Sequence, residues 1–277
     1  MTYINTLLDS IDYMQYAEKN DLWELLSINK KKYNLKKQSQ AIFENADYGV
    51  DNDLTEPYIA DINDLVRIHY LVRHLKVVTA LEIGCGKSTL VIADAINKNK
   101  KEYGEFVSNH LRKNNPFELH SIETSERWAE ITKKTIPNNL KNCTKIHVTD
   151  CKMDLFNSRV CTTFLKIPNV CPDFIYLDGP DQYAPLGDIG GVSTNHPDRM
   201  PMVADLNRIE PFLLPGTVIL VDGRSANAQF MRNNFQQDWG YFYYRDFDIH
   251  IFVNESPTLG IYNQKELDFK WIDIKKN

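Results

Sequence analysis

The chain has 277 residues, of which 43% are hydrophobic and 25% are charged, and its formal net charge is −5. This composition is that of an ordinary globular protein, and the length allows one α/β domain with elaborations or two small domains. The acidic balance, without a long basic run interleaved with aromatic residues, disfavours nucleic acid as a partner. No apolar stretch is long enough for a bilayer, and no secretory apolar segment stands at the N-terminus, so we expect neither a membrane span nor a signal peptide. The five cysteines show no C-x-x-C pair or metal-ligand spacing, which predicts free thiols in the cytoplasm.

The chain divides into three parts by composition. Residues 1–60 are polar and rich in Tyr and Lys, and we expect them to form a mostly helical extension that caps the main domain. Residues 61–256 carry the alternation of apolar runs and amphipathic stretches that predicts the main domain. Residues 257–277 form a C-terminal tail, in which Phe269 and Trp271 are available to dock on the domain or on a neighbour.

The main domain begins with an amphipathic helix at residues 62–76, for which Asp61 is the expected N-cap. An apolar run at residues 77–83 then predicts a buried strand, and Gly84 and Gly86 follow it directly. Glycines at this point allow a sharp turn and the close approach of a ligand to the backbone. The next helix begins behind them, so its unpaired N–H groups and partial positive charge face the turn.

Three ligand-binding motifs compete for this turn. A phosphate-binding P-loop needs a glycine where Leu81 stands. A dinucleotide fingerprint needs a third glycine where Thr89 stands. The Glu-x-Gly-x-Gly-x-Ser pattern of residues 82–88 resembles, without a gap, motif I of the class I S-adenosylmethionine-dependent methyltransferases. A glycine-rich turn without a ligand is the remaining alternative. The resemblance implies that the methionine part of the cofactor is held by Glu82, Gly84, Gly86 and Ser88.

An acidic residue also ends the second predicted strand. Residues 118–122 form this strand, Glu123 follows it, and Thr124 or Ser125 can cap the next helix. At this position a nucleoside-binding α/β fold accepts hydrogen bonds from ribose hydroxyls, while a contact with the helix N-terminus is the alternative role. Glu123 lies farther past the glycines than the roughly 20 residues usual for such folds. We attribute the excess to a polar insertion at residues 97–115.

Further strand ends continue the pattern. A third strand at residues 144–149 is followed by Asp150, which by the resemblance contacts the adenine amino group, with an Asx turn as the alternative. A fourth strand at residues 174–177 ends at Asp178, and a fifth at residues 218–221 ends at Asp222.

The C-terminal part of the domain completes the resemblance. The Asp-Gly pair after the fourth strand and the Leu-Pro-Gly turn before the fifth are common in class I methyltransferases. Runs at residues 241–245 and 249–253 predict a terminal hairpin. The similarity covers about residues 60–255 and implies a three-layer Rossmann-like α/β sandwich, with a seven-stranded mostly parallel sheet and a C-terminal antiparallel hairpin strand.

The acceptor side of the site is expected beyond the carboxyl ends of the strands. Residues 180–200 form a long Gly- and Pro-containing loop there, which we interpret as the acceptor-binding lid. His196 in this loop is a candidate base because its ordinary pKa is near neutrality, and a solvent-exposed loop histidine is the alternative. Arg199 and Arg224 are candidates for contacting an acidic acceptor, although each alone is more often a surface ion-pair partner.

The two strand-end aspartates also raise the question of a metal. The sequence is similar to metal-dependent O-methyltransferases of the catechol and macrolide-sugar type, in which two strand-end carboxylates and a following Asn or Asp bind Mg²⁺. Gly223 stands at the position of that third ligand. The resemblance leaves metal dependence open, and the missing ligand disfavours it.

These observations predict a cytoplasmic S-adenosylmethionine-dependent methyltransferase of the O-methyltransferase type. The expected substrate is a small polar molecule or a glycan precursor, and the expected catalytic residues are Asp178, His196 and Asp222. One alternative is an NAD-dependent oxidoreductase or epimerase that uses the same turn. Another is an inactive methyltransferase-fold binding module. The sequence does not indicate an oligomeric state.

Overall fold

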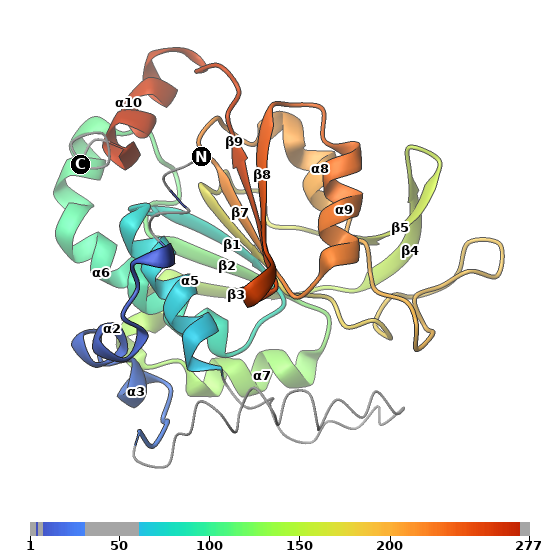
Figure 1. Cartoon of the computed structure of the whole chain (residues 1–277), viewed down its shortest axis with the longest axis horizontal. Coiled ribbons are helices and arrows are strands. Elements are labelled where there is room, and N and C mark those ends of the chain that lie inside the picture. Colours follow the sequence, from blue (N-terminus) through green and yellow to red (C-terminus); the bar gives the residue numbers. More distant parts are fainter. Residues whose placement is uncertain (1–3, 5–7, 31–60, 272–277) are drawn as a thin grey trace.

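The computed structural model describes residues 4, 8–30 and 61–271, and its middle layer is a seven-stranded sheet (Figure 1). The strand order is β3-β2-β1-β6-β7-β9-β8. β9 is antiparallel to both β7 and β8, and all other neighbouring pairs of strands are parallel. The predicted three-layer α/β fold with a C-terminal antiparallel hairpin strand is therefore confirmed. The strands are β1 (Thr79–Ile83), β2 (Glu118–Glu123), β3 (Thr144–Val148), β6 (Phe174–Leu177), β7 (Val218–Asp222), β8 (Trp239–Tyr244) and β9 (Ile249–Asn254).

Helices cover both faces of this sheet, and one hydrophobic core lies on each side. The central strands β1 and β6 are buried at every residue, as continuous apolar runs of a parallel sheet require. On one face lie α5 (Ile62–His74), α6 (Lys87–His110) and α7 (Glu126–Thr135). On the other lie α8 (Asp205–Ile209) and α9 (Ser225–Asn234). Short 3-10 helices lie in the connections at η1 (Asn138–Cys143), η2 (Glu210–Phe212) and η3 (Arg245–Phe247).

The predicted helix caps are present. The Asp61 side chain accepts a hydrogen bond from the Asn63 backbone N–H at 2.8 Å and so begins α5. At the start of α7, Ser125 accepts one from the Trp128 backbone N–H at 3.2 Å. Each cap satisfies an N–H group that the helix itself leaves without a partner.

Two short helices of the N-terminal part, α2 (Tyr13–Lys19) and α3 (Leu22–Leu25), pack on the α5 side of the domain. The Tyr16 hydroxyl and His69 Nδ1 on α5 are hydrogen-bonded at 2.8 Å. Residues 31–60 lie outside the described residues. The predicted boundary at residue 60 therefore stays a prediction.

The polar stretch at 97–115 is helical up to His110, because α6 continues through it without a break. The extra residues thus lengthen a helix instead of forming a separate loop. Lys, Glu and Asn outside a core are compatible with an exposed helix, and the first proline comes only at Pro116.

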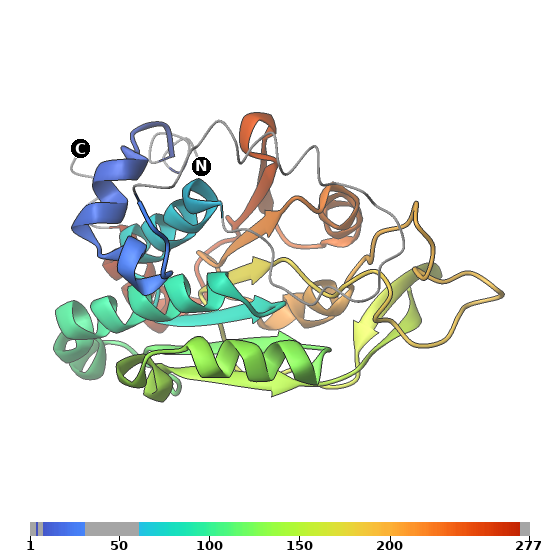
Figure 2. The same cartoon turned by 90° about the horizontal axis from the view of Figure 1, so that it is seen from below.

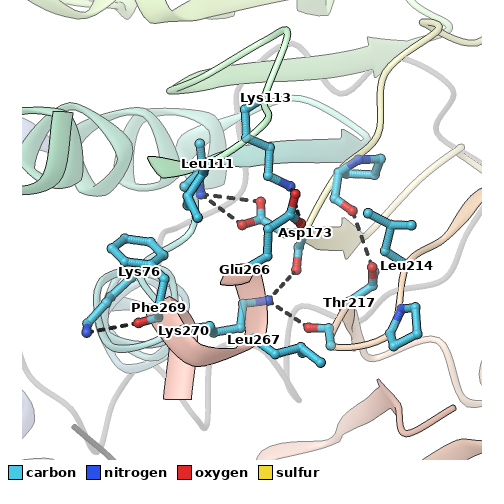
Figure 3. A pocket seen from close by; sticks show the side chains of 14 residues that line it. Lys76, Leu111, Lys113, Asp173, Leu214, Thr217, Glu266, Leu267, Phe269 and Lys270 are labelled. Atoms are coloured by element: carbon cyan, nitrogen blue, oxygen red, sulfur yellow. Dashed lines mark hydrogen bonds and ion pairs between the residues drawn. The ribbon is translucent and has the colours of Figure 1, made fainter. Parts of the chain in front are cut away.

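The C-terminal segment also forms a helix, α10 (Gly260–Trp271), which docks on the domain at the amino ends of the parallel strands. Phe269 packs into the core on the α5 side and stacks on Phe106 of α6. Figure 3 shows how Lys270 points from α10 toward the sheet. Its amine donates hydrogen bonds to the carbonyls of Asp173 at 3.0 Å and Gly216 at 2.7 Å.

A second, two-stranded sheet was not predicted. β4 (Cys151–Phe156) and β5 (Arg159–Phe164) form an antiparallel hairpin that projects beyond the carboxyl edge of the main sheet (Figures 1 and 2). Asn157 and Ser158 make its two-residue turn, both with positive φ. That turn was a readable signal, since Asn followed by a small residue between two strand-like runs favours a tight hairpin.

Candidate functional site

The glycine turn lies between β1 and α6, at the carboxyl edge of the sheet. Gly84 has a φ of +92°, which a side chain rarely tolerates. Its Cα and N lie 2.8 Å from where a Cβ on Gly179 would stand, and Gly179 follows Asp178 in the neighbouring turn after β6. The two turns therefore cross so closely that both positions require glycine.

Gly86 differs from its neighbour. Its φ of 173° is extended backbone that any residue adopts, and a Cβ placed there would meet no atom within 4 Å. Glycine here is required neither by the backbone nor by protein neighbours. It leaves open space at the N-terminus of α6, and the partial positive charge of a helix N-terminus favours a polar or anionic group.

Glu82 lies behind the turn and is fully buried. Its carboxylate accepts hydrogen bonds from the hydroxyls of Ser88 at 2.7 Å, Thr89 at 2.7 Å and Ser121 at 2.5 Å. Burial raises the pKa of Glu82 to about 7, although these three hydroxyls oppose the rise. Glu82 thus ties the glycine turn to β1 and β2, and the Ser88 hydroxyl is directed at Glu82.

Glu123, at the end of β2, holds the turn from the other side. It accepts hydrogen bonds from the backbone N–H groups of Cys85 at 3.1 Å, Thr124 at 2.8 Å and Ser125 at 2.9 Å. The contact with the start of α7, which the sequence offered as an alternative role, is therefore present. A carboxylate has about four lone-pair sites, so a ribose hydroxyl remains compatible with these contacts. Asp150 is exposed in the connection between β3 and β4.

Asp178 and Arg224 meet at the ends of β6 and β7. The Arg224 guanidinium donates to Asp178 Oδ1 at 3.3 Å, to the Asp178 carbonyl at 2.6 Å and to the Pro180 carbonyl at 2.9 Å. The Asp178 side chain is still 51% exposed, so it is crowded by protein on one side and open to solvent on the other. Desolvation raises the pKa of Asp178 to about 6, the Arg224 charge opposes this, and Asp222 adds to it.

Asp222 is adjacent to Asp178 on the same face of the sheet, since Leu177 and Val221 are paired in the register. The Tyr176 hydroxyl donates to Asp222 Oδ2 at 2.7 Å, and burial raises the pKa of Asp222. Sequence reasoning missed Tyr176, although its place two residues before Asp178 puts it on the same side of β6. Carboxylates therefore stand at or near the ends of four adjacent strands: Glu123 in β2, Glu82 in β1, Asp178 after β6 and Asp222 in β7.

This row does not fit a Mg²⁺ site. Octahedral Mg²⁺ needs carboxylate oxygens that are free to coordinate it. The Arg224 guanidinium contacts Asp178 Oδ1 and Tyr176 donates to Asp222 Oδ2, so each carboxylate keeps at most one oxygen without a protein partner. Gly223 brings no third ligand. Among the residues that the structure describes, no group of three or more His, Cys, Asp or Glu side chains is arranged to hold a metal ion.

His196 lies in the lid, and none of its hydrogen bonds is to Asp178 or Asp222. Its Nδ1 accepts a hydrogen bond from the Asp198 backbone N–H at 3.1 Å, and its carbonyl accepts one from Gln182. The side chain is 46% exposed. Arg199 donates to the Ser193 carbonyl within the same loop. Both arginines considered for an acidic acceptor are thus engaged with protein oxygen atoms.

The lid is attached to the unpredicted hairpin on both sides. Leu186 pairs with β4, its carbonyl accepting from Met153 N–H at 2.9 Å. After the loop, Ala204 N–H donates to the Thr162 carbonyl on β5 at 2.9 Å. The hairpin therefore forms the frame of the lid.

The loop that carries Arg224 is anchored to the C-terminal hairpin through a buried histidine. His250 Nε2 is hydrogen-bonded to the hydroxyl of Ser225 at 2.8 Å, and its Nδ1 to that of Tyr241 at 2.9 Å. The Gly223 N–H donates to the Asp248 carbonyl at 2.9 Å. These contacts hold Arg224 in position against Asp178.

Within the described ranges, no helix combines the length and the apolar character that crossing a membrane requires.

Comparison with known families gives one match over half of the chain. The model of a family described as "Methyltransferase domain" matches residues 81–223, from β1 through the end of β7. The matched range contains the glycine turn, all four strand-end carboxylates and the lid. A comparison with curated proteins found no significant relative.

Solved structures give several weaker likenesses. The SAH-bound methyltransferase PaMTH1 of Podospora anserina is 13% identical, with a TM-score of 0.47, over 81% of this chain and 97% of that one. The O-methyltransferase TomG of Streptomyces achromogenes, in complex with SAM, is 15% identical, with a TM-score of 0.42, over 89% and 100%. An O-methyltransferase of Bacillus cereus, in complex with SAH, is 14% identical, with a TM-score of 0.39, over 87% and 99%.

Proposed function

This chain belongs to the methyltransferase domain family, and we propose that it transfers a methyl group from S-adenosylmethionine to an oxygen atom of a small polar molecule or a glycan precursor. The observation that carries the proposal is the open space at Gly86, at the N-terminus of α6 and beside the row of carboxylates. The family match disfavours the alternative of an NAD-dependent oxidoreductase.

The cofactor residues are proposed from their places around this space. Gly84, Gly86 and Ser88 hold the methionine part, and the buried Glu82 holds the turn in place through its hydrogen bonds to Ser88 and Thr89. Glu123 receives the ribose hydroxyls, and Asp150 receives the adenine amino group. The methyl donor is a sulfonium cation, and a row of partly desolvated carboxylates favours a cation over a neutral ligand.

The transfer is an in-line displacement, for which the bound cofactor supplies an electrophilic methyl group. The protein aligns the acceptor oxygen with that methyl and keeps water out. We assign proton removal to Asp178, because its carboxylate is half exposed and its pKa of about 6 lies closer to neutrality than an ordinary aspartate's. The acceptor O–H loses its proton to Asp178, the oxygen lone pair forms the new O–C bond, and the C–S bond electrons return to sulfur.

Asp222 and His196 have smaller roles in this proposal. Asp222 is held by Tyr176 and acts on Asp178 through its charge. His196 is kept as an alternative base that reaches the acceptor through the lid. Replacing His196 with Asn separates the two assignments: lost methyl transfer at unchanged cofactor affinity assigns proton removal to His196 instead of Asp178.

The proposals for the acceptor molecule and for the cellular location rest on fewer observations. Arg224 and Arg199 are bonded to protein oxygens, which favours a neutral acceptor over an acidic one. The lid supplies polar side chains such as Asp181 and Tyr183. All five cysteines are free thiols, which supports a cytoplasmic location.

Calorimetric titration of the full chain with S-adenosylmethionine, S-adenosylhomocysteine, NAD and ATP in parallel tests the proposal. We expect the two sulfur nucleosides to bind and NAD and ATP to give no heat. Tight binding of NAD or ATP without the sulfur nucleosides overturns it. Binding of both nucleosides without methyl transfer to any of a panel of polyols, phenols and sugars favours the inactive binding module.

A further inference from the structure

A cavity lies between the end of α9 and the strands β8 and β9. Figure 1 shows these elements on the α8 and α9 side of the molecule. Its volume is about 240 Å³. Phe235, Trp239 and Tyr241 in its lining pack against the core on that side. Tyr176, which donates to Asp222, belongs to the core on the other side. The cavity is therefore separated from the proposed methyl-transfer site by the sheet. It is lined by Arg232, Phe235, Gln237, Trp239, Tyr241 and Phe252.

The aromatic walls of this cavity are fixed in place. Phe235 and Trp239 are stacked, with ring centroids 4.6 Å apart and planes at 17°. The fully buried Phe252 contacts Phe235 edge-on at 5.6 Å and Tyr241 at 4.9 Å. Trp239 Nε1 donates to Glu210 Oε1 at 2.9 Å, which sets the plane of the indole. Rigid ring faces of this kind favour a flat aromatic ligand.

The polar groups of the cavity are donors. The Arg232 guanidinium lies over the Tyr241 ring, 4.6 Å from its centroid, and is exposed at the rim. No carboxylate of the described residues pairs with it. The Gln237 side-chain oxygen accepts from Asn254 at 2.6 Å, and its NH₂ group makes no hydrogen bond to the described residues. The Tyr241 hydroxyl is held by His250 and Gln229. A donor lining with one guanidinium selects an anion.

We propose that this cavity binds a small planar aromatic carboxylate, with the ring against Trp239 and the carboxylate on Arg232, whose guanidinium lies over Tyr241. The volume is below the 300–1,000 Å³ of pockets for drug-sized ligands, so one or two fused rings fit and a dinucleotide does not. The carboxylate forms a bidentate pair with the guanidinium fork. This site is independent of the proposed methyl transfer, and either can fail without the other.

Calorimetry with 2-naphthoate as the probe tests the site on the full chain. The neutral 2-naphthylmethanol has the same rings without the charge, and we expect it to bind roughly tenfold more weakly than naphthoate, as for a lost charge-assisted pair. Arg232→Met should weaken naphthoate by the same factor and leave the alcohol unchanged. Arg159→Met, which removes an exposed arginine at the tip of the β4–β5 hairpin, should behave as the unmodified chain.

The location is checked by the indole N–H signals of the four tryptophans in ¹H–¹⁵N NMR spectra. The Trp239 signal, assigned with a Trp239→Phe variant, should shift on addition of naphthoate, while those of Trp23, Trp128 and Trp271 stay in place. Saturation with S-adenosylhomocysteine should leave the naphthoate titration intact. The proposal is overturned by absence of naphthoate binding at millimolar concentration, by equal affinity in Arg232→Met, by shifts confined to other tryptophans, or by competition with the nucleoside.

Discussion

Charged side chains lie at both edges of the central sheet, but their surroundings differ. At the amino edge, α10 covers the charges (Figure 3). The buried Lys113 pairs with Glu266 at 3.0 Å, and the amine of Lys270 is bonded to two backbone carbonyls. At the carboxyl edge, Asp178 stays half exposed and its pKa is raised, with open space at Gly86 nearby.

This contrast separates charges that hold the fold together from charges that we propose to contact a ligand. A buried ammonium group whose hydrogen bonds all go to the protein fixes the helix that carries it. A carboxylate with a shifted pKa that remains accessible is a candidate for chemistry. The same sheet thus places charges bound by the protein at one edge, and the charges that we propose to act in the site at the other.

The largest expected effect comes from breaking the crossing at the carboxyl edge with Gly179→Ala. A Cβ there would lie 2.8 Å from the Gly84 backbone, so one of the two turns must move. We expect the free energy of unfolding to fall by at least about 2 kcal/mol, and S-adenosylhomocysteine binding to be lost. Urea unfolding and calorimetry measure the two effects. As a control, Gly104→Ala in α6 should raise stability by roughly 0.5–1 kcal/mol. Unchanged cofactor binding in Gly179→Ala would contradict the close crossing.

Gly86→Val tests the open space without breaking the fold. The backbone at Gly86 is extended and no protein atom lies within 4 Å of the added Cβ, so unfolding in urea should match the unmodified chain. The added methyl groups should block the cofactor and weaken S-adenosylhomocysteine by on the order of 100-fold, which is about 2.7 kcal/mol. Gly86→Ala should give an intermediate loss. Full affinity in the valine variant would show that the ligand lies elsewhere.

Lys270→Met tests, through the pH dependence of stability, whether the Lys270 amine at the amino edge is desolvated. Burial lowers the pKa of Lys270 to about 8 from its usual 10.5, so between these values the unfolded chain binds more protons. Stability should therefore rise as the pH increases from 8 to 10.5, and the variant should lack this part of the rise. Each unit of the shift corresponds to about 1.4 kcal/mol. Urea unfolding across this range measures it, with the exposed Lys133→Met as control. Identical slopes in Lys270→Met and the unmodified chain would show that the amine is not desolvated.

Arg224→Met should have the smallest effect, on the pH dependence of cofactor binding. The Arg224 charge lowers the pKa of Asp178, so its removal should move the titration of this carboxylate upward from about 6. We expect a shift on the order of 0.5 pH units, because the pair is screened by solvent. The affinity for the cationic S-adenosylmethionine should fall as Asp178 gains its proton, and that for the neutral homocysteine nucleoside should change little. Calorimetry from pH 5 to pH 8 measures both. An unmoved midpoint would remove Asp178 from the site.

Local signals allowed the sequence to predict much of the fold. The apolar runs at β1, β6 and β7, the caps Asp61 and Ser125, and the glycine turn each depend on neighbours in the chain. The β4–β5 hairpin was missed because Cys151 comes directly after an expected strand end, and its threonines gave no clear alternation. The helical form of residues 97–110 was missed because polar composition alone does not distinguish an exposed helix from a loop.

The site was predicted as positions along the chain, and its contacts depend on residues far apart in sequence. That Asp178 and Asp222 end neighbouring strands followed from strand order. That Arg224 clamps the Asp178 and Pro180 carbonyls, and that Ser121 reaches Glu82, required the register of the sheet. The roles of His196 and Asp150 stay predictions.

The attachment of the lid to the hairpin has a consequence for how this protein can acquire new specificities. Because Leu186 and Ala204 are fastened to β4 and β5, the stretch between them begins and ends at fixed points. Such a stretch can be replaced or lengthened while the β4–β5 hairpin and the glycine turn stay as they are. If this stretch binds the acceptor as proposed, changes within it alter specificity without moving the strands that carry the carboxylates.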